Sequence, residues 1–125
     1  CPSDSVDLVL LFALLTCVID NKQQQQIIDE AWRILKPGGY VYINDFLLNT
    51  DDRNIGRYKK YVHKYNTYGI FELDDGGVFR HHDKAYILKL LSGFKQELLK
   101  KIVFTTMNGH LSNGFVMLAK KVNNE

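Results

Sequence analysis

Apolar positions along this chain form two strand-like runs separated by a helix-like stripe. Leu8 to Phe12 is apolar at every position, which is typical of a central parallel strand with helices on both faces. Ile27 to Leu35 repeats apolar residues at steps of three and four, the spacing of one helix face. Tyr40 to Ile43 is β-branched and aromatic and predicts a second buried strand. A strand, a helix and a strand in this order predict two parallel neighbours, and therefore a doubly wound α/β fold.

Polar residues and glycines mark the ends of the first helix. Asp20 or Asn21 can cap its start, because a glutamine follows three residues later. The run Gln23 to Gln26 is expected to lie on the solvated face of this helix. Pro37 to Gly39 should stop the helix before the second strand. Ala13 to Ile19 continues the first apolar run, and we expect a short helical segment there.

The middle of the chain predicts a helix and a hairpin. Asn49 to Asp52 supplies turn and cap residues, and apolar residues then recur at helical steps from Ile55 to Tyr65. This helix should be basic and rich in tyrosine. Asp74 to Gly77 is typical of a tight turn, which predicts a small hairpin between the short apolar runs that flank it.

The last part of the chain predicts one helix and an antiparallel pair of strands. Asp83 can cap a helix that ends at Gly93. Leu98 to Thr106 and Gly114 to Lys120 are strand candidates joined by a short segment rich in turn residues. Because they are so close in sequence, these two strands should pair antiparallel.

Composition narrows the possible classes. The chain has 125 residues and is 46% hydrophobic, enough for one globular domain with a real core. A net charge of +2, from 16 basic and 14 acidic residues mixed along the chain, gives no field that would attract nucleic acid or an anionic membrane. The uncharged run from Leu8 to Ile19 is shorter than the roughly 20 residues of a membrane span. We therefore expect neither nucleic acid nor a membrane as a partner.

The two cysteines and the first residue add two expectations. Cys1 and Cys17 form no disulfide framework or metal-type spacing, which suits a reducing compartment and predicts a cytoplasmic protein. Cys17 is expected to be a buried structural thiol. The chain begins with cysteine, and its only methionines are Met107 and Met117. We therefore expect this sequence to be a piece of a longer protein.

Four motifs follow one another in a recognisable order. Asp7 to Leu11 is an aspartate followed by aliphatic residues, and Ile34 to Asp45 contains Leu-Lys-Pro-Gly-Gly and a strand. Val78 to Phe94 ends in Gly-Phe, and Gly114 to Lys121 ends in a small residue and two lysines. Together these motifs resemble the fourth to seventh strands of class I S-adenosylmethionine-dependent methyltransferases.

The resemblance covers nearly the whole chain and implies an architecture. It implies the C-terminal half of a Rossmann-like methyltransferase sheet: two parallel strands plus a terminal antiparallel pair, flanked by helices. Residues 1–125 would be the C-terminal portion of a single domain, and residues 47–80 an acceptor-side lid insertion. The family's glycine-rich cofactor loop, and the acidic residue that holds the ribose, have no counterpart in this sequence. The chain thus resembles half an enzyme.

The resemblance also implies a function, namely transfer of a methyl group from S-adenosylmethionine to a small-molecule acceptor. Such a transfer depends mostly on alignment and on exclusion of water, so the lack of a catalytic triad is no objection. In open α/β sheets ligands bind beyond the carboxyl ends of the strands. By resemblance, backbone groups at Phe12, Ala13 and Leu14 would contact the methionine end of the cofactor.

Several residues are candidates for contact with the acceptor. Asn44 and Asp45 lie at the end of the second strand; they could face the acceptor, or could merely end the strand and hydrogen-bond a loop. A tyrosine-rich segment follows, in the place where relatives carry a variable lid, although tyrosines at helical spacing also pack in cores. His81, His82 and Asp83 form no supported metal site, because adjacent side chains point in different directions. The substrate-binding candidates are Asn44, Asp45, Tyr58, His63, Tyr65, Arg80 and His81.

A second hypothesis stays open beside the enzyme. The same scaffold could be a non-catalytic α/β module that binds a partner and has lost its cofactor-binding half. Under either hypothesis the strand at Asp7 to Phe12 has an unprotected edge without charge or proline in its apolar part. We expect this edge to pair with a second copy of the chain, as a homo-oligomer, or with the missing N-terminal half.

Overall fold

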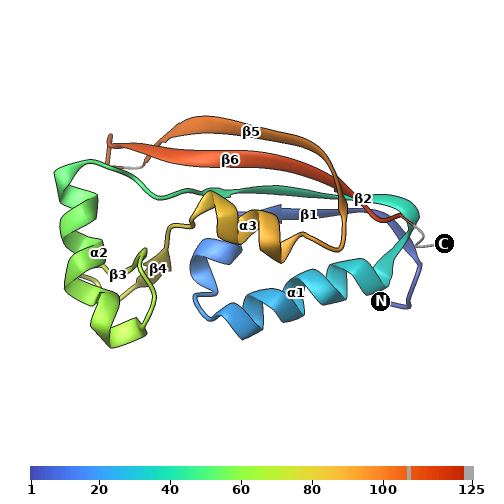
Figure 1. The fold of residues 1–125 in the computed structure, drawn as a ribbon, viewed down its shortest axis with the longest axis horizontal. Helices are drawn as coiled ribbons and strands as arrows, with labels where there is room; N and C mark the ends of the chain where they lie inside the picture. Colours follow the sequence, from blue (N-terminus) through green and yellow to red (C-terminus); the bar gives the residue numbers. More distant parts are fainter. Residues whose placement is uncertain (107, 123–125) are drawn as a thin grey trace.

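The computed structural model describes residues 1–106 and 108–122, in which a four-stranded mixed sheet carries its helices on one face (Figure 1). β1 pairs parallel with β2, whereas β6 is antiparallel to both β2 and β5. The predicted parallel pair and antiparallel pair are therefore confirmed. In sheet order the strands are β1 (Val6–Phe12), β2 (Leu35–Phe46), β6 (Leu111–Lys120) and β5 (Lys95–Thr105).

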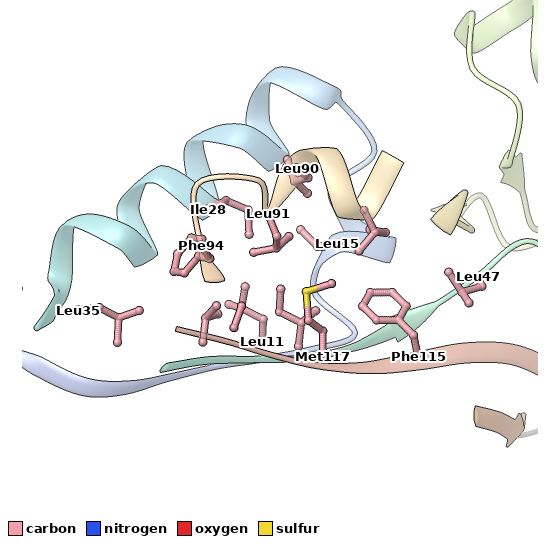
Figure 2. Packing of buried hydrophobic residues seen from close by; sticks show 14 residues of the cluster. Leu11, Leu15, Ile28, Leu35, Leu47, Leu90, Leu91, Phe94, Phe115 and Met117 are labelled. Atoms are coloured by element: carbon pink, nitrogen blue, oxygen red, sulfur yellow. The ribbon is translucent and has the colours of Figure 1, made fainter. Parts of the chain in front are cut away.

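Two α-helices and a short 3-10 helix cover one face of the sheet and close the core. These are α1 (Asn21–Ile34), α3 (Lys84–Leu90) and η1 (Leu15–Cys17). Figure 2 shows side chains of the sheet, such as Leu11 and Met117, pointing toward this layer. Burial of these aliphatic and aromatic groups is the main term that stabilises the fold, at about 25 cal/mol per Å² of apolar surface.

The start of α1 agrees with the prediction from the sequence, but one glutamine of the run Gln23 to Gln26 is buried instead of solvated. The backbone N–H of Gln23 donates to Asp20 Oδ2 at 3.1 Å, so Asp20 is the predicted cap. Ile28 and Ala31 are buried against the sheet. Gln24, expected on the solvated face, is fully buried, because its position in the helix repeat lies on the same side as Ile28.

The Pro-Gly-Gly turn has a different place from the one expected. α1 ends at Ile34, and the strand begins at once, at Leu35, instead of at Tyr40. Pro37 to Gly39 is thus an irregular excursion inside the start of β2, where the register with β1 shifts. Gly38 has a φ of +86°, a conformation that only glycine adopts readily.

A second group of elements forms a lobe at one end of the sheet (Figure 1). It consists of α2 (Asp52–Tyr65) and the hairpin of β3 (Ile70–Glu72) and β4 (Val78–Arg80). All three lie within residues 47–80, the segment predicted as a lid. The predicted helix and the predicted hairpin are both confirmed. None of the helices in the described part of the chain is long and apolar enough to cross a membrane.

The opposite face of the sheet is open, which corrects the expectation that β1 has helices on both faces. Leu8, Leu10 and Phe12 are 50%, 52% and 61% exposed. They alternate with the buried side of the strand and lie beside Tyr40 and Tyr42 of β2. β1 is also the edge strand. In residues 1–106 and 108–122 the helices cover only the other face (Figure 1).

This open, apolar edge generates the first prediction. We expect the 125-residue chain to dimerise with a second copy through β1, because unpaired backbone groups and exposed leucines favour edge-to-edge pairing. Leu10→Lys should convert the dimer to a monomer in sedimentation equilibrium. Leu88→Lys is the matched control, since Leu88 is also exposed but lies on α3, and it should leave the dimer intact. A wild-type chain that is monomeric at every concentration would contradict the prediction.

Candidate functional site

A cavity of about 340 Å³ lies at the carboxyl ends of β1 and β2, between the sheet and the lobe. The described residues that line it come from the turn after β1 with η1, the end of β2, helix α2, the β3–β4 hairpin with the residue that follows it, and the end-to-start connection from β5 to β6. This is the position that the sequence predicted for a ligand. The described residues that line the cavity are Ala13, Thr16, Cys17, Phe46, Arg53, Asn54, Arg57, Phe71, Leu73, Phe79, Thr106, Asn108, His81, His110 and Ser112.

The cavity combines an apolar wall with two guanidinium groups. Three aromatic rings supply the wall, those of Phe46, Phe71 and Phe79. The Arg57 guanidinium lies 3.9 Å from the centre of the Phe71 ring, a cation–π contact that holds the side chain in place. Arg53 lies one helical turn earlier on α2. The described lining includes no aspartate or glutamate.

His81 is the predicted acceptor residue that the structure does place in the cavity lining. Its Nδ1 lies 2.5 Å from the Tyr58 hydroxyl, and that hydroxyl accepts a bond from the Asn49 N–H at 3.1 Å. We assign Tyr58 as the donor to Nδ1, because the side-chain amide nitrogen of Asn49, which can only donate, also lies 3.4 Å from that nitrogen. This assignment leaves the ring proton on Nε2. Burial, together with the smaller effect of nearby Arg57, lowers the pKa of His81 to about 3. His81 is thus a neutral ring whose free nitrogen is a donor.

Tyr58 lies behind His81 and does not reach the cavity itself. Its side chain is fully buried and does not line the cavity. Its hydroxyl fixes the tautomer of His81, so its influence on a ligand would pass through that ring.

Asp45 lies beneath the cavity and ties two strand ends together. Its Oδ2 accepts the N–H groups of Leu15 and Thr16 at 2.9 and 3.3 Å, and its Oδ1 accepts the N–H of Phe46 at 2.8 Å. The carboxylate is 1% exposed, and burial raises its pKa to about 6 against the effect of those three bonds. This geometry favours the alternative in which Asp45 ends the strand and holds a loop.

His82 completes the buried layer under the cavity. Its Nδ1 donates to the Phe46 carbonyl at 2.9 Å, and its Nε2 accepts from the Gln24 amide at 3.0 Å. Burial lowers the pKa of His82 to about 4, so the ring is neutral. The 3.8 Å between His82 Nδ1 and Asp45 Oδ1 is therefore not an ion pair at neutral pH.

The three residues predicted to contact the cofactor lie where β1 turns into η1. Ala13 has a φ of +51°, which is costly for a residue with a side chain and marks a tightly constrained turn. Its N–H donates to the Asn44 carbonyl at 2.7 Å. Because backbone groups alternate in direction along a parallel strand, those of Phe12 face away from β2. In the described part of the chain these groups have no strand partner, because β1 is the edge strand.

The other predicted acceptor residues lie away from the cavity. Asn44 is half-buried on the open face of the sheet, and His63 is exposed on α2. The Tyr65 hydroxyl donates to Glu72 at 2.7 Å. Arg80 is 4% exposed and donates to the Ile19 carbonyl at 3.0 Å, in the layer around α1.

Sequence reasoning missed Arg53 and Arg57, and expected Cys17 to be buried. The signal was available, since two arginines four residues apart lie on one face of a helix. Cys17 is exposed and lines the cavity. Within residues 1–106 and 108–122, no group of three His, Cys, Asp or Glu side chains is arranged to hold a metal ion.

The buried histidines generate a prediction about pH. His81 and His82 have folded pKa values near 3 and 4, below the ordinary 6.5, so the unfolded chain binds more protons and stability falls as pH drops below 6.5. Asp45, raised from 3.8 to about 6, acts in the opposite direction. The effect of the two histidines exceeds that of Asp45. We therefore expect the free energy of unfolding to fall by about 2 kcal/mol between pH 7 and pH 5.

Urea unfolding at the two pH values measures this loss. His81→Asn keeps an acceptor for Tyr58 but cannot take up a proton, so it should remove about half of the histidine contribution. Equal pH dependence in the wild type and in this variant would show that His81 does not titrate as described.

Comparison with known proteins agrees with this geometry. Residues 1–43 match the family model described as "Methyltransferase domain". No curated protein matches the chain. A SAM-dependent methyltransferase from Methanosarcina mazei matches 98% of the chain with a TM-score of 0.91 and 27% identity. The chain spans 62% of that protein's length.

Two further structures match at lower identity. A putative methyltransferase from Bacillus halodurans has a TM-score of 0.64 and 16% identity, over 98% of this chain and 67% of that one. The 1,6-didemethyltoxoflavin-N1-methyltransferase of Burkholderia thailandensis, solved with S-adenosylhomocysteine, has a TM-score of 0.67 and 14% identity, over 98% and 47%. The predicted α/β architecture is confirmed: the chain has the fold of the class I S-adenosylmethionine-dependent methyltransferases.

Proposed function

We propose that this chain is part of an S-adenosylmethionine-dependent methyltransferase and supplies the side that holds a small-molecule acceptor. The observation that carries the proposal is the position of the cavity. It lies at the carboxyl ends of two parallel strands, in a fold shared over 98% of the chain with a methyltransferase. That end of an open α/β sheet is the usual place for a ligand.

The residues of this chain have distinct tasks in the proposal. S-adenosylmethionine, when bound, supplies a methyl group already activated by its sulfonium. The turn from Phe12 to Leu14 would contact its methionine end. The aromatic wall excludes water from the acceptor, and His81 orients the acceptor through its Nε2 hydrogen. A neutral His81 with Nδ1 engaged is a donor, so it does not serve as a general base.

The lobe of residues 47–80 is proposed to be the lid over the acceptor. It supplies Arg53, Arg57 and Phe71 to the cavity, and it joins the sheet at the Leu47–His82 bridge. A segment attached in this way can open and close over a ligand while its anchor stays fixed.

Titration calorimetry with S-adenosylhomocysteine tests the proposal. Alone, the 125-residue chain should bind it with a Kd well above 1 μM, which corresponds to about 8 kcal/mol, because Phe12 to Leu14 offers only a one-sided contact. A fusion with the part of the Methanosarcina mazei protein that the chain does not span should bind far more tightly than either half. A folded fusion that binds no product would overturn the proposed function.

One observation favours the alternative, a non-catalytic binding module. The open face of Leu8, Leu10 and Phe12 is a surface that a partner could cover. The same titration separates the two functions, because a module would ignore S-adenosylhomocysteine even in the fusion. In either case we infer a reducing, cytoplasmic compartment from the two free, exposed cysteines.

A further inference from the structure

We propose that the acceptor carries an oxyanion head, a carboxylate or a phosphate, on a flat apolar body, and that Arg53, Arg57 and His81 bind that head. The inference rests on the proposed function in one respect: it takes the cavity to be the acceptor site. It names the class of molecule that the cavity is built to hold.

The charges around the cavity are uncompensated. Neither Arg53 nor Arg57 forms an ion pair within the described residues, and the described lining has no carboxylate. Asp51, the N-cap of α2, is engaged by the backbone N–H and the side-chain amide of Asn54, at 3.2 and 2.7 Å. Asp52, in the first turn of α2, forms no ion pair with either arginine within the described residues. Two guanidinium groups beside one cavity therefore lack an anion.

The contacts of Arg57 point to the same ligand chemistry. One of its terminal nitrogens donates to Asn54 Oδ1, and its face lies over Phe71. Its Nε is buried and, like the Nε of Arg80 outside the cavity, has no partner among the described residues. Buried donors are normally satisfied, and an oxyanion is the acceptor that a guanidinium binds most strongly.

His81 adds a third donor of defined direction. The Tyr58 hydroxyl occupies Nδ1, so Nε2–H is the hydrogen left for a ligand. The neutral ring adds no charge of its own. Its task is to fix where the oxyanion lies relative to the two arginines.

The rest of the cavity favours a flat apolar body. The Phe46 ring is tilted by 31° from that of His81 at a centroid distance of 5.5 Å. Phe71 lies edge-on to His81 at 4.8 Å. Aromatic rings in such a wall pack well against another ring, and about 340 Å³ accommodates a small aromatic acid.

Binding of simple probes to the 125-residue chain tests the inference without S-adenosylmethionine. The probes are benzoate, phenyl phosphate and neutral benzyl alcohol, followed by NMR titration. At least one of the two anions should bind about tenfold more tightly than benzyl alcohol. The anion that binds better identifies the head group as a carboxylate or a phosphate.

Variants distinguish anion binding at this specific site from binding caused by the positive charge of the helix as a whole. Arg53→Gln and Arg57→Gln should each weaken anion binding about tenfold, and His81→Asn should weaken it less. Lys59→Gln is the matched control, because it removes one charge from the exposed side of the same helix, and it should change the affinity less than about twofold. Arg53 is exposed, so Arg53→Gln should fold even if the half-buried Arg57 variant does not.

Two outcomes would overturn the inference. They are equal binding of benzyl alcohol and the anions, and equal loss in Lys59→Gln and Arg53→Gln. Failure of the proposed function looks different, since a fusion that ignores S-adenosylhomocysteine would leave anion binding by these residues intact.

Discussion

The buried carboxylate of Asp45 is the interaction on which the site depends. It accepts N–H groups from Leu15, Thr16 and Phe46, and so it joins the turn after β1 to the end of β2. A charge taken out of water is costly unless hydrogen bonds replace its hydration. Three backbone donors do so here. The carboxylate thereby holds the turn through Ala13, which lines the cavity.

His82 and Gln24 extend this polar layer toward the helices. His82 joins the Phe46 carbonyl to Gln24. The two amide hydrogens of Gln24 are shared among three acceptors, namely His82 Nε2 and the carbonyls of Leu15 and Val18. Buried polar groups that are all satisfied make a rigid platform. His81 directly precedes His82 in the chain. The same polar layer therefore supports both the floor of the cavity and the imidazole that donates into it.

The sheet of this chain has one open face, whereas a doubly wound sheet is covered by helices on both faces. Leu8, Leu10 and Phe12 are exposed, whereas the cavity lies at the strand ends, between the sheet and the lobe. The two surfaces are distinct. Covering one does not require filling the other, and this is why self-association and acceptor binding can be measured separately.

The sequence by itself determined the local elements, because caps, turns and apolar spacing act over a few residues: Asp20 at the start of α1, the Asp74–Gly77 turn and the paired final strands all follow from it. Other features depended on tertiary structure. Insertion of β6 between β2 and β5, burial of Gln24 and convergence of Arg53, Arg57 and His81 arise from contacts between residues far apart in the chain. His81 could be predicted as a polar residue near the strand ends, but its tautomer and neutral state are set by Tyr58 and by burial, which no local pattern encodes.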